Sequence, residues 1–261
     1  MTPHAPLGPN APIALVTGGQ QGIGLGIASA LAHAGFRLAI VSLPAASDPV
    51  VVQALKRLGP DARYFRHDLA DVAAIPALMA QVANDMGPIT ALVQNAGVAA
   101  KVRGDMLDIT PEHFDFVNAV NLRGAFFLAQ AVARQMLSQP QSPFRSITFV
   151  TSVSARMASV ERADYCISKA GAAMAAQAFA LRLAPHGIGV YELRPGIIDT
   201  AMTAAVKDTY TARIEGGLVP AARWGMPQDI GAVIVPLATG QFAFATGAVI
   251  PVDGGLSIER L

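Results

Sequence analysis

The sequence predicts one doubly wound α/β domain, with about seven parallel strands and helices on both faces of the sheet. Short apolar runs alternate with segments whose apolar residues recur at helical spacing, and this alternation is typical of a parallel sheet. The chain has 261 residues, of which 52% are hydrophobic and 14% charged, which suits one domain with a large buried core. We see no internal repeat or shift in composition that would mark a second domain.

The expected elements alternate regularly along the chain. Strands are expected at 12–17, 37–42, 62–66, 90–94, 146–151, 188–193 and 247–251. Helices are expected at 22–34, 49–58, 71–86, 112–137, 163–184 and 227–239. Residues 12–261 would form the domain, with residues 199–224 as an insertion of mixed character on the substrate side. Residues 1–11, from a proline-rich start, would form a flexible tail.

A glycine-rich turn after the first expected strand predicts a dinucleotide site. The apolar run Ile13–Thr17 is followed by Gly18, Gly22 and Gly24, and a helical pattern begins within this turn. Strand, glycine loop and helix form the context that such a motif requires. The glycines allow backbone N–H groups to approach a pyrophosphate at the positive end of the helix.

Tyr165 and Lys169 predict acid–base chemistry, because residues four apart on a helix share one face. A free tyrosine has a pKa of about 10, and a cation held beside it is expected to lower that pKa. The hydroxyl of Ser152, upstream in the sequence, could position a carbonyl oxygen against the phenol. These groups suit proton transfer to a carbonyl that receives a hydride.

Several of these motifs follow directly after expected strands. Gly18, Asn95, Ser152 and Pro195 each come after one, and ligands of open parallel sheets bind beyond the carboxyl ends of the strands. We therefore expect one edge of the sheet to carry the site.

With these motifs in order, the chain resembles the short-chain dehydrogenase/reductase family from about Ile13 to Gly255. The motifs are Thr17-Gly-x-x-x-Gly-x-Gly24, Asn95-Ala-Gly97, Asn121, Ser152, Tyr165-x-x-x-Lys169 and Arg194-Pro-Gly-x-x-x-Thr200. The resemblance implies a Rossmann-like fold and a catalytic tetrad of Asn121, Ser152, Tyr165 and Lys169. The layout is most similar to that of 3-oxoacyl-carrier-protein reductases.

The resemblance also implies a set of cofactor contacts. Asn121 would disrupt its helix and support a proton relay, and Thr200 would bond the nicotinamide carboxamide. Asp68 would lie beside the adenine, or would simply bond its own backbone. The expected contacts are Gly18, Gln21, Gly22, Ile23, Gly24, Ser42, Leu43, Asp68, Leu69, Asn95, Ala96, Gly97, Tyr165, Lys169, Pro195, Gly196, Ile198 and Thr200.

Two departures from the family pattern concern the adenosine side. Gln94 stands where the family has the first of two asparagines, so altered packing is expected there. Ser42 stands where the family often has an aspartate that selects NAD. Leu43 carries no charge, and Gln20 and Gln21 replace the basic residue that many NADP-using members of the family carry in the glycine loop. A 2′-phosphate would therefore lack a charge-assisted partner. NAD(H) is narrowly favoured as cofactor, with NADP(H) possible.

The predicted activity is hydride transfer between a nicotinamide and a carbonyl or secondary alcohol, similar to 3-oxoacyl thioester reduction. An alternative is a dehydrogenase for polyols, sugars or small cyclic alcohols. A nucleotide-sensing protein without catalysis is a remote alternative, because the tyrosine, lysine and serine are all present. Lys101, Arg103 and Arg162 suit an anionic or hydroxylated substrate, or serve only solubility.

Composition excludes other classes. A net charge of +1 without a basic block gives no basis for nucleic-acid binding, and no apolar run approaches a membrane span. The single Cys166 excludes an internal disulfide, and the histidines lack metal-ligand spacing. A cytoplasmic protein is expected. Small residues in 163–184, together with 112–137, resemble the family's dimer-forming helices and predict a homotetramer.

Overall fold

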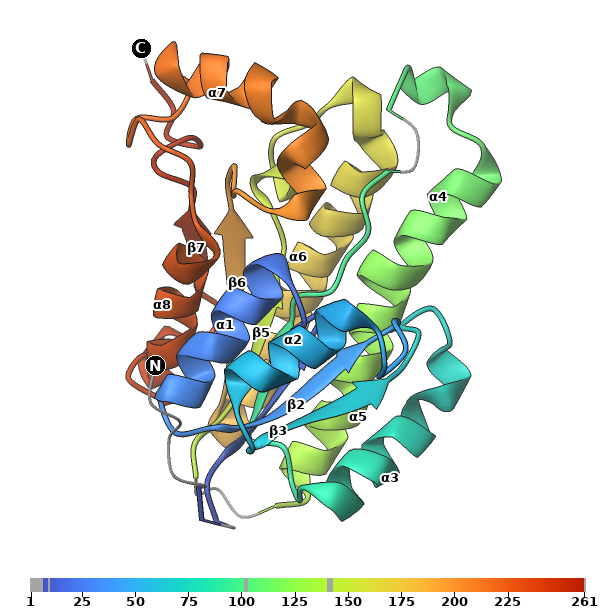
Figure 1. Cartoon of the computed structure of the whole chain (residues 1–261), viewed down its shortest axis with the longest axis vertical. Helices are drawn as coiled ribbons and strands as arrows, with labels where there is room; N and C mark the ends of the chain where they lie inside the picture. Colours follow the sequence, from blue (N-terminus) through green and yellow to red (C-terminus); the bar gives the residue numbers. More distant parts are fainter. Residues whose placement is uncertain (1–6, 9, 101–102, 140–142, 261) are drawn as a thin grey trace.

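A seven-stranded parallel sheet organises the chain in the computed structural model, which describes residues 7–8, 10–100, 103–139 and 143–260 (Figure 1). Every strand expected from the sequence is confirmed, with ends that differ by at most two residues. The strands are β1 (Ile13–Thr17), β2 (Arg37–Ser42), β3 (Ala62–Arg66), β4 (Ala91–Gln94), β5 (Arg145–Val150), β6 (Ile188–Pro195) and β7 (Val249–Val252).

The strand order is β3-β2-β1-β4-β5-β6-β7, so the direction of winding reverses between β1 and β4. Thr17 lies beside Val41 of β2, and Val16 lies beside Val93 of β4. In sheets of this kind, the crevice beyond the carboxyl ends of the strands at this reversal is where ligands bind. The predicted doubly wound architecture is therefore present.

Helices cover both faces of the sheet and enclose two apolar cores. One core includes Ile27 of α1 (Gly22–His33) and Ile234 of α8 (Pro227–Ala238), and Leu55 of α2 (Pro49–Leu58) packs against it. The other core includes side chains from three further helices. These helices are α3 (Ile75–Asp85), α5 (Ala125–Leu137) and α6 (Ala163–Leu183).

The helix expected at 112–137 is interrupted. It comprises α4 (Pro111–Asn118), a π-helical segment (Ala119–Gly124) and α5. Thr110 caps it, because its side chain accepts a hydrogen bond from the N–H of His113. By length and composition the run 111–137 could cross a membrane, but α5 contributes side chains to the core. The π-helical segment places Asn121 inside the protein, where it is 2% exposed.

The insertion 199–224 contains an element that the sequence did not reveal, and one expected helix needs correction. The insertion 199–224 contains a helix, α7 (Lys207–Glu215), which the sequence did not reveal because Ile214 is its one buried residue. Figure 1 shows α7 beyond the carboxyl ends of β6 and β7. The helix expected at 71–86 is a short 3₁₀ turn, Val72–Ala74, followed by α3. Of the expected tail, residues 1–6 and 9 lie outside the described residues, and the N–H of Leu7 bonds to the side chain of Asp61.

Candidate active site

The turn between β1 and α1 has the glycine geometry that the motif predicts. Gly18 and Gly22 adopt positive φ angles of 67° and 51°, which side chains disfavour. The N–H of Gly18 donates to the carbonyl of Val41 at 2.8 Å, which ties the turn to β2. A Cβ on Gly24 would overlap the carbonyl oxygen of Gly18. Only glycine at these positions allows the backbone to form this loop.

Asn95 and Thr17 fasten the loop after β4 to the glycine turn. The Asn95 Nδ2 donates to the carbonyl of Thr17 at 2.9 Å. The Thr17 hydroxyl accepts from the N–H groups of Asn95 and Ala96 at 3.0 and 2.9 Å. Gln94 is 4% exposed and donates to the carbonyl of Ala125. The Asn95 amide thus holds the backbone of the glycine turn, and Thr17 is a supporting residue that the sequence reasoning missed.

Asn121 and Lys169 meet around Gly97. A Cβ on Gly97 would lie 3.1 Å from the Asn121 Oδ1 and 3.3 Å from the Lys169 Nζ. The Lys169 Nζ donates to the carbonyl of Val150 at 3.2 Å and lies 5.7 Å from the centre of the Tyr165 ring. The structure therefore brings the lysine, the asparagine and the tyrosine together at the ends of β4 and β5.

Ser168 connects Asn121 to helix α6. The Asn121 Nδ2 donates to the Ser168 hydroxyl at 3.1 Å, and that hydroxyl donates to the carbonyl of Tyr165 at 2.8 Å. The other bonds of Asn121 go to the N–H and carbonyl of Val98, at 2.8 and 3.0 Å. Sequence reasoning missed Ser168. The available signal was a serine three residues after Tyr165, on the buried side of α6.

The electrostatics of the tyrosine differ from the sequence-based expectation. Burial raises the pKa of Tyr165, and this effect outweighs the lowering by the Ser152 hydrogen bond and by the positive charges of Arg162 and Arg103. Burial also lowers the pKa of Lys169 to about 8. The sequence-based prediction of a net lowering of the Tyr165 pKa is therefore wrong, because burial decides the direction. A phenol with a raised pKa is protonated at neutral pH and is available as a proton donor.

The segment after β6 lies opposite the glycine turn. Gly196 has no room for a side chain, because a Cβ there would lie 2.7 Å from the Cα of Asp253. The methyl group of Thr200 lies 3.4 Å from the position of a Cβ on Gly22. The Gln20 Oε1 in the turn is buried and has no hydrogen-bond partner. A dinucleotide fits here, because the glycines leave space along the turn and because the Gln20 Oε1 is a buried acceptor that a ligand could satisfy.

The ends of β2 and β3 form the expected adenosine side. The Ser42 hydroxyl is bonded to the Tyr64 hydroxyl at 2.9 Å, and Leu43 is 55% exposed. The Arg66 Nε donates to the carbonyl of Leu43 at 3.1 Å. A cation thus stands where none was expected, because the register pairs Ser42 with Arg66. The Asp68 Oδ1 accepts from the N–H of Ala70 at 2.9 Å, as in the local-turn interpretation.

The remaining expected contacts surround these groups. Gln21 is exposed at the start of α1, where Ile23 packs against the core. Leu69 and Ile198 are buried, at 5% and 4% exposure. Pro195 is buried at the end of β6. Among the described residues, no group of three or more histidine, cysteine, aspartate or glutamate side chains is placed to hold a metal ion.

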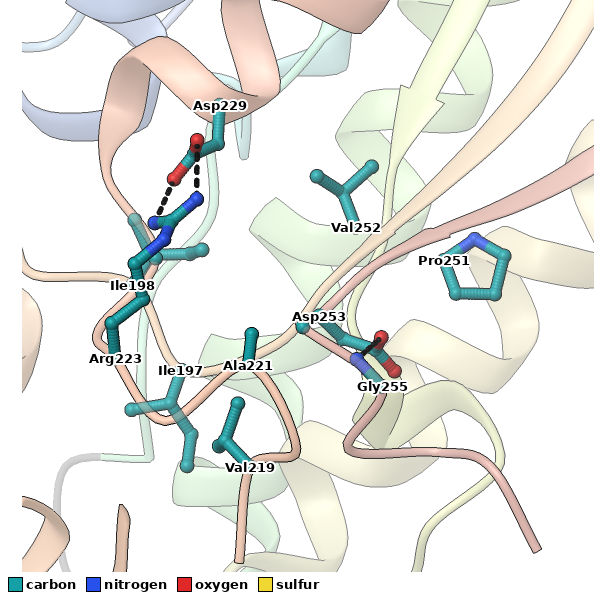
Figure 2. A pocket seen from close by; sticks show the side chains of 12 residues that line it. Ile197, Ile198, Val219, Ala221, Arg223, Asp229, Pro251, Val252, Asp253 and Gly255 are labelled. Carbon is teal, nitrogen blue, oxygen red and sulfur yellow. Dashed lines mark hydrogen bonds and ion pairs between the residues drawn. The ribbon is translucent and has the colours of Figure 1, made fainter. Parts of the chain in front are cut away.

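A hollow of about 320 Å³ lies beside this site, between the segment after β6 and the turn after β7 (Figure 2). Arg223 and Asp229 bound it with two hydrogen bonds of 2.7 and 3.0 Å. The Arg223 bond lowers the pKa of Asp229. Ile198 lines the hollow, whereas Tyr165 and Ser152 do not. This hollow is therefore separate from the acid–base groups.

Known proteins resemble this chain over nearly its whole length. A family model described as enoyl-(acyl carrier protein) reductase matches residues 18–257. The 3-oxoacyl-[acyl-carrier-protein] reductase MabA of Mycobacterium tuberculosis is 34% identical, over 94% of this chain and 92% of its own. D-threitol dehydrogenase of Mycolicibacterium smegmatis is 33% identical, over 95% of this chain and 93% of its own.

Among solved structures, a 3-oxoacyl-[acyl-carrier protein] reductase from Brucella melitensis in complex with NAD is 52% identical, with a TM-score of 0.92. The match covers 97% of this chain and 99% of that one. Together with the glycine turn and the tyrosine–lysine pair, these matches establish what kind of enzyme this is. The chain belongs to the short-chain dehydrogenase/reductase family and is an NAD(P)-dependent oxidoreductase that transfers a hydride between nicotinamide and a carbonyl or secondary alcohol.

Proposed function

We propose that the protein reduces the keto group of a 3-oxoacyl thioester, with Tyr165 as the general acid. The observation that carries this proposal is the hydrogen bond between the Ser152 hydroxyl and the Tyr165 phenol. Ser152 lies at the same edge of the sheet, beyond the carboxyl ends of the strands, as the glycine turn. The 3-oxoacyl reductases among its relatives support the substrate class. The D-threitol dehydrogenase supports a polyol substrate as the second candidate.

Bound NAD(P)H supplies the hydride. As the carbonyl carbon receives it, the electron pair of the C=O bond moves to the oxygen, and Tyr165 donates its proton there. The Ser152 hydroxyl holds the same oxygen in place. A raised pKa keeps the phenol protonated until charge develops on the oxygen. In the oxidative direction, Tyr165 would act as the base.

Lys169 and Asn121 support this step. Buried at 5% exposure, the Lys169 ammonium lies near enough to the Tyr165 ring to stabilise the phenolate left after proton donation, and it would also bind the nicotinamide ribose. The side-chain amide of Asn121 is hydrogen-bonded to Val98 and to Ser168. These bonds hold the loop after β4 against α6. We propose that Asn121 supports a proton relay to the site.

The proposed cofactor preference is for NAD(H), because the similar reductase from Brucella melitensis was solved in complex with NAD, and we expect weak discrimination against NADP(H). The Ser42 hydroxyl is already engaged by Tyr64 and carries no charge, so a ribose hydroxyl fits beside it. No carboxylate stands at Ser42 to repel a 2′-phosphate. Arg66 offers guanidinium N–H groups near Leu43, so a 2′-phosphate would find a partner there.

We also propose a cytoplasmic homotetramer. Ile167, Met174 and Leu181 follow one another at seven-residue spacing on α6 and are 49%, 63% and 81% exposed. Side chains at this spacing lie close to one face of a helix, and an exposed apolar stripe favours burial against another copy. A monomeric mass by light scattering at micromolar concentration would contradict the assembly.

The activity is tested by following NADH and NADPH absorbance with 3-oxoacyl thioesters, and NAD⁺ reduction with polyols. We expect the thioesters to give the higher kcat/KM. Turnover of polyols with no thioester activity would favour the second candidate, and no turnover in either series would contradict the proposal.

A further inference from the structure

Arg103 and Arg162 lie on two segments that meet beside the start of α6. The guanidinium carbon of Arg162 lies 5.6 Å from the centre of the Tyr165 ring. Arg103 precedes Gly104, whose N–H donates to the carbonyl of Glu161 at 3.3 Å. This bond joins the loop after β4 to the turn that begins α6. The segment that carries Arg103 therefore lies beside the turn that carries Arg162.

Among the described residues, neither Arg103 nor Arg162 forms an ion pair. The neighbouring Glu161 is exposed and is in no ion pair there either. The Asp164 carboxylate is buried, and its Oδ1 accepts a hydrogen bond from the N–H of Tyr165. Both guanidinium charges act on the Tyr165 phenol and lower its pKa against the larger effect of burial.

We infer that the acyl chain of the substrate carries, in addition to the neutral thioester, an anionic group such as a carboxylate a few bonds from the reacting carbonyl, and that Arg103 and Arg162 bind this group. A carbonyl oxygen bonded to the phenol would lie about 2.8 Å from it. The short distance from the ring to Arg162 then places a nearby carboxylate within reach of a guanidinium fork, which binds carboxylates well. The inference rests on the proposed carbonyl chemistry and adds a feature of its substrate.

The test compares two substrates with the same keto group, acetoacetate and its neutral ethyl ester. The variants are Arg162→Gln, Arg103→Gln and Arg162→Lys. The matched control is Arg156→Gln, because Arg156 is a nearby arginine already paired with Glu259 at 2.6 Å. Each protein is assayed for kcat and KM with NADH at fixed pH.

We expect wild type to prefer acetoacetate over the ester. Each glutamine variant should lower kcat/KM for acetoacetate about tenfold or more, mainly through KM, since a hydrogen bond to a charged group is lost. The ester should change by no more than about twofold, the scale of a weak exposed-charge effect. Arg162→Lys should recover part of the loss, and the Arg156 control should match wild type.

Equal losses for acid and ester would overturn the inference, because the arginines would then serve only the phenol. So would a wild type that prefers the ester. Calorimetric titration of malonate into the enzyme with NAD⁺ measures binding without turnover. Both glutamine variants should bind malonate more weakly than wild type. Unchanged binding would contradict the inference. Thioester turnover with no preference for anions would leave the proposed function standing and remove only this inference.

Discussion

The acid–base end and the adenosine end of the site are built differently. At the acid–base end, Lys169 and Asn121 are 5% and 2% exposed, and their side chains bond to neighbouring backbone or to Ser168. At the adenosine end, Leu43 is 55% exposed. The exposed side chain of Arg66 donates a hydrogen bond to the carbonyl of Leu43. We therefore expect the chemistry to depend on buried groups and the choice of cofactor to depend on groups that remain in water.

This difference predicts a gradient of mutational effects. Removing a partner of a buried polar group costs about 1–3 kcal/mol or more, whereas exposed charges contribute about 0–1 kcal/mol. Substitutions near Tyr165 should therefore change the rate by orders of magnitude. Substitutions near Leu43 should change a ratio of affinities by a small factor.

The largest effect is expected for Tyr165→Phe, which keeps the ring and removes the transferable proton. General acid–base groups contribute about a hundred- to ten-thousand-fold in rate, so kcat should fall by that factor. The Kd for NADH, measured by fluorescence titration, should change little. A variant with near-normal turnover would contradict the role of the phenol.

Gly24→Ala is expected to act on nucleotide binding. Its Cβ would overlap the carbonyl oxygen of Gly18, and overpacking of this kind costs about 1–3 kcal/mol. The Kd for NADH should rise by about ten- to a hundredfold. Gly8→Ala is the control, because nothing lies within 4 Å of a Cβ there. The Tm of each variant distinguishes a loss of binding from a loss of folding. Unchanged affinity for NADH in Gly24→Ala would contradict the assignment of the glycine turn to nucleotide binding.

The pH dependence should sharpen the assignment of Lys169. Burial lowers its pKa to about 8, so its ammonium is present below that pH and lost above it, while the raised pKa keeps Tyr165 protonated. The kcat/KM of reduction should fall above about pH 8, by up to tenfold per pH unit. Lys169→Met should lack this limb. A reduction rate that rises through pH 8 would contradict the assignment.

The smallest effect is expected for Arg66→Gln, at the exposed end. A surface cation contributes little, so the ratio of Kd values for NADPH and NADH should shift toward NADH by no more than about fivefold. Arg63→Gln is the control, since Arg63 is an exposed arginine of β3 on the opposite face. An unchanged ratio in Arg66→Gln would exclude Arg66 from the adenosine side.

Much of the fold could be predicted, because the buried strands and amphipathic helices have strong local patterns. The strand β2 matched at both ends, since its apolar run is bounded by Arg37 and Ser42. Helix α7 was missed because it buries one side chain, Ile214, and offers no apolar stripe. The π-helical segment at Asn121 was expected only from the family resemblance, as its residues read like ordinary helix.

The candidate site residues that belong to short sequence motifs could be predicted. Contacts that depend on how neighbouring strands align could not. Tyr165 and Lys169 share a helix face by spacing alone. The contact of Arg66 with Leu43 required the alignment of β2 with β3. The pKa of Tyr165 could not be derived from a neighbouring cation, because burial of the phenol decides its direction.

The most direct measurement compares Tyr165→Phe and Arg66→Gln in one assay of 3-oxoacyl thioester reduction, with NADH and with NADPH. Tyr165→Phe should lower kcat by about a hundredfold or more with either cofactor and leave the ratio of the two unchanged. Arg66→Gln should leave kcat near wild type and shift only the ratio of kcat/KM values. A Tyr165→Phe enzyme that retains its kcat, or an Arg66→Gln enzyme that loses it, would contradict the division of the site into a buried chemical end and an exposed selecting end.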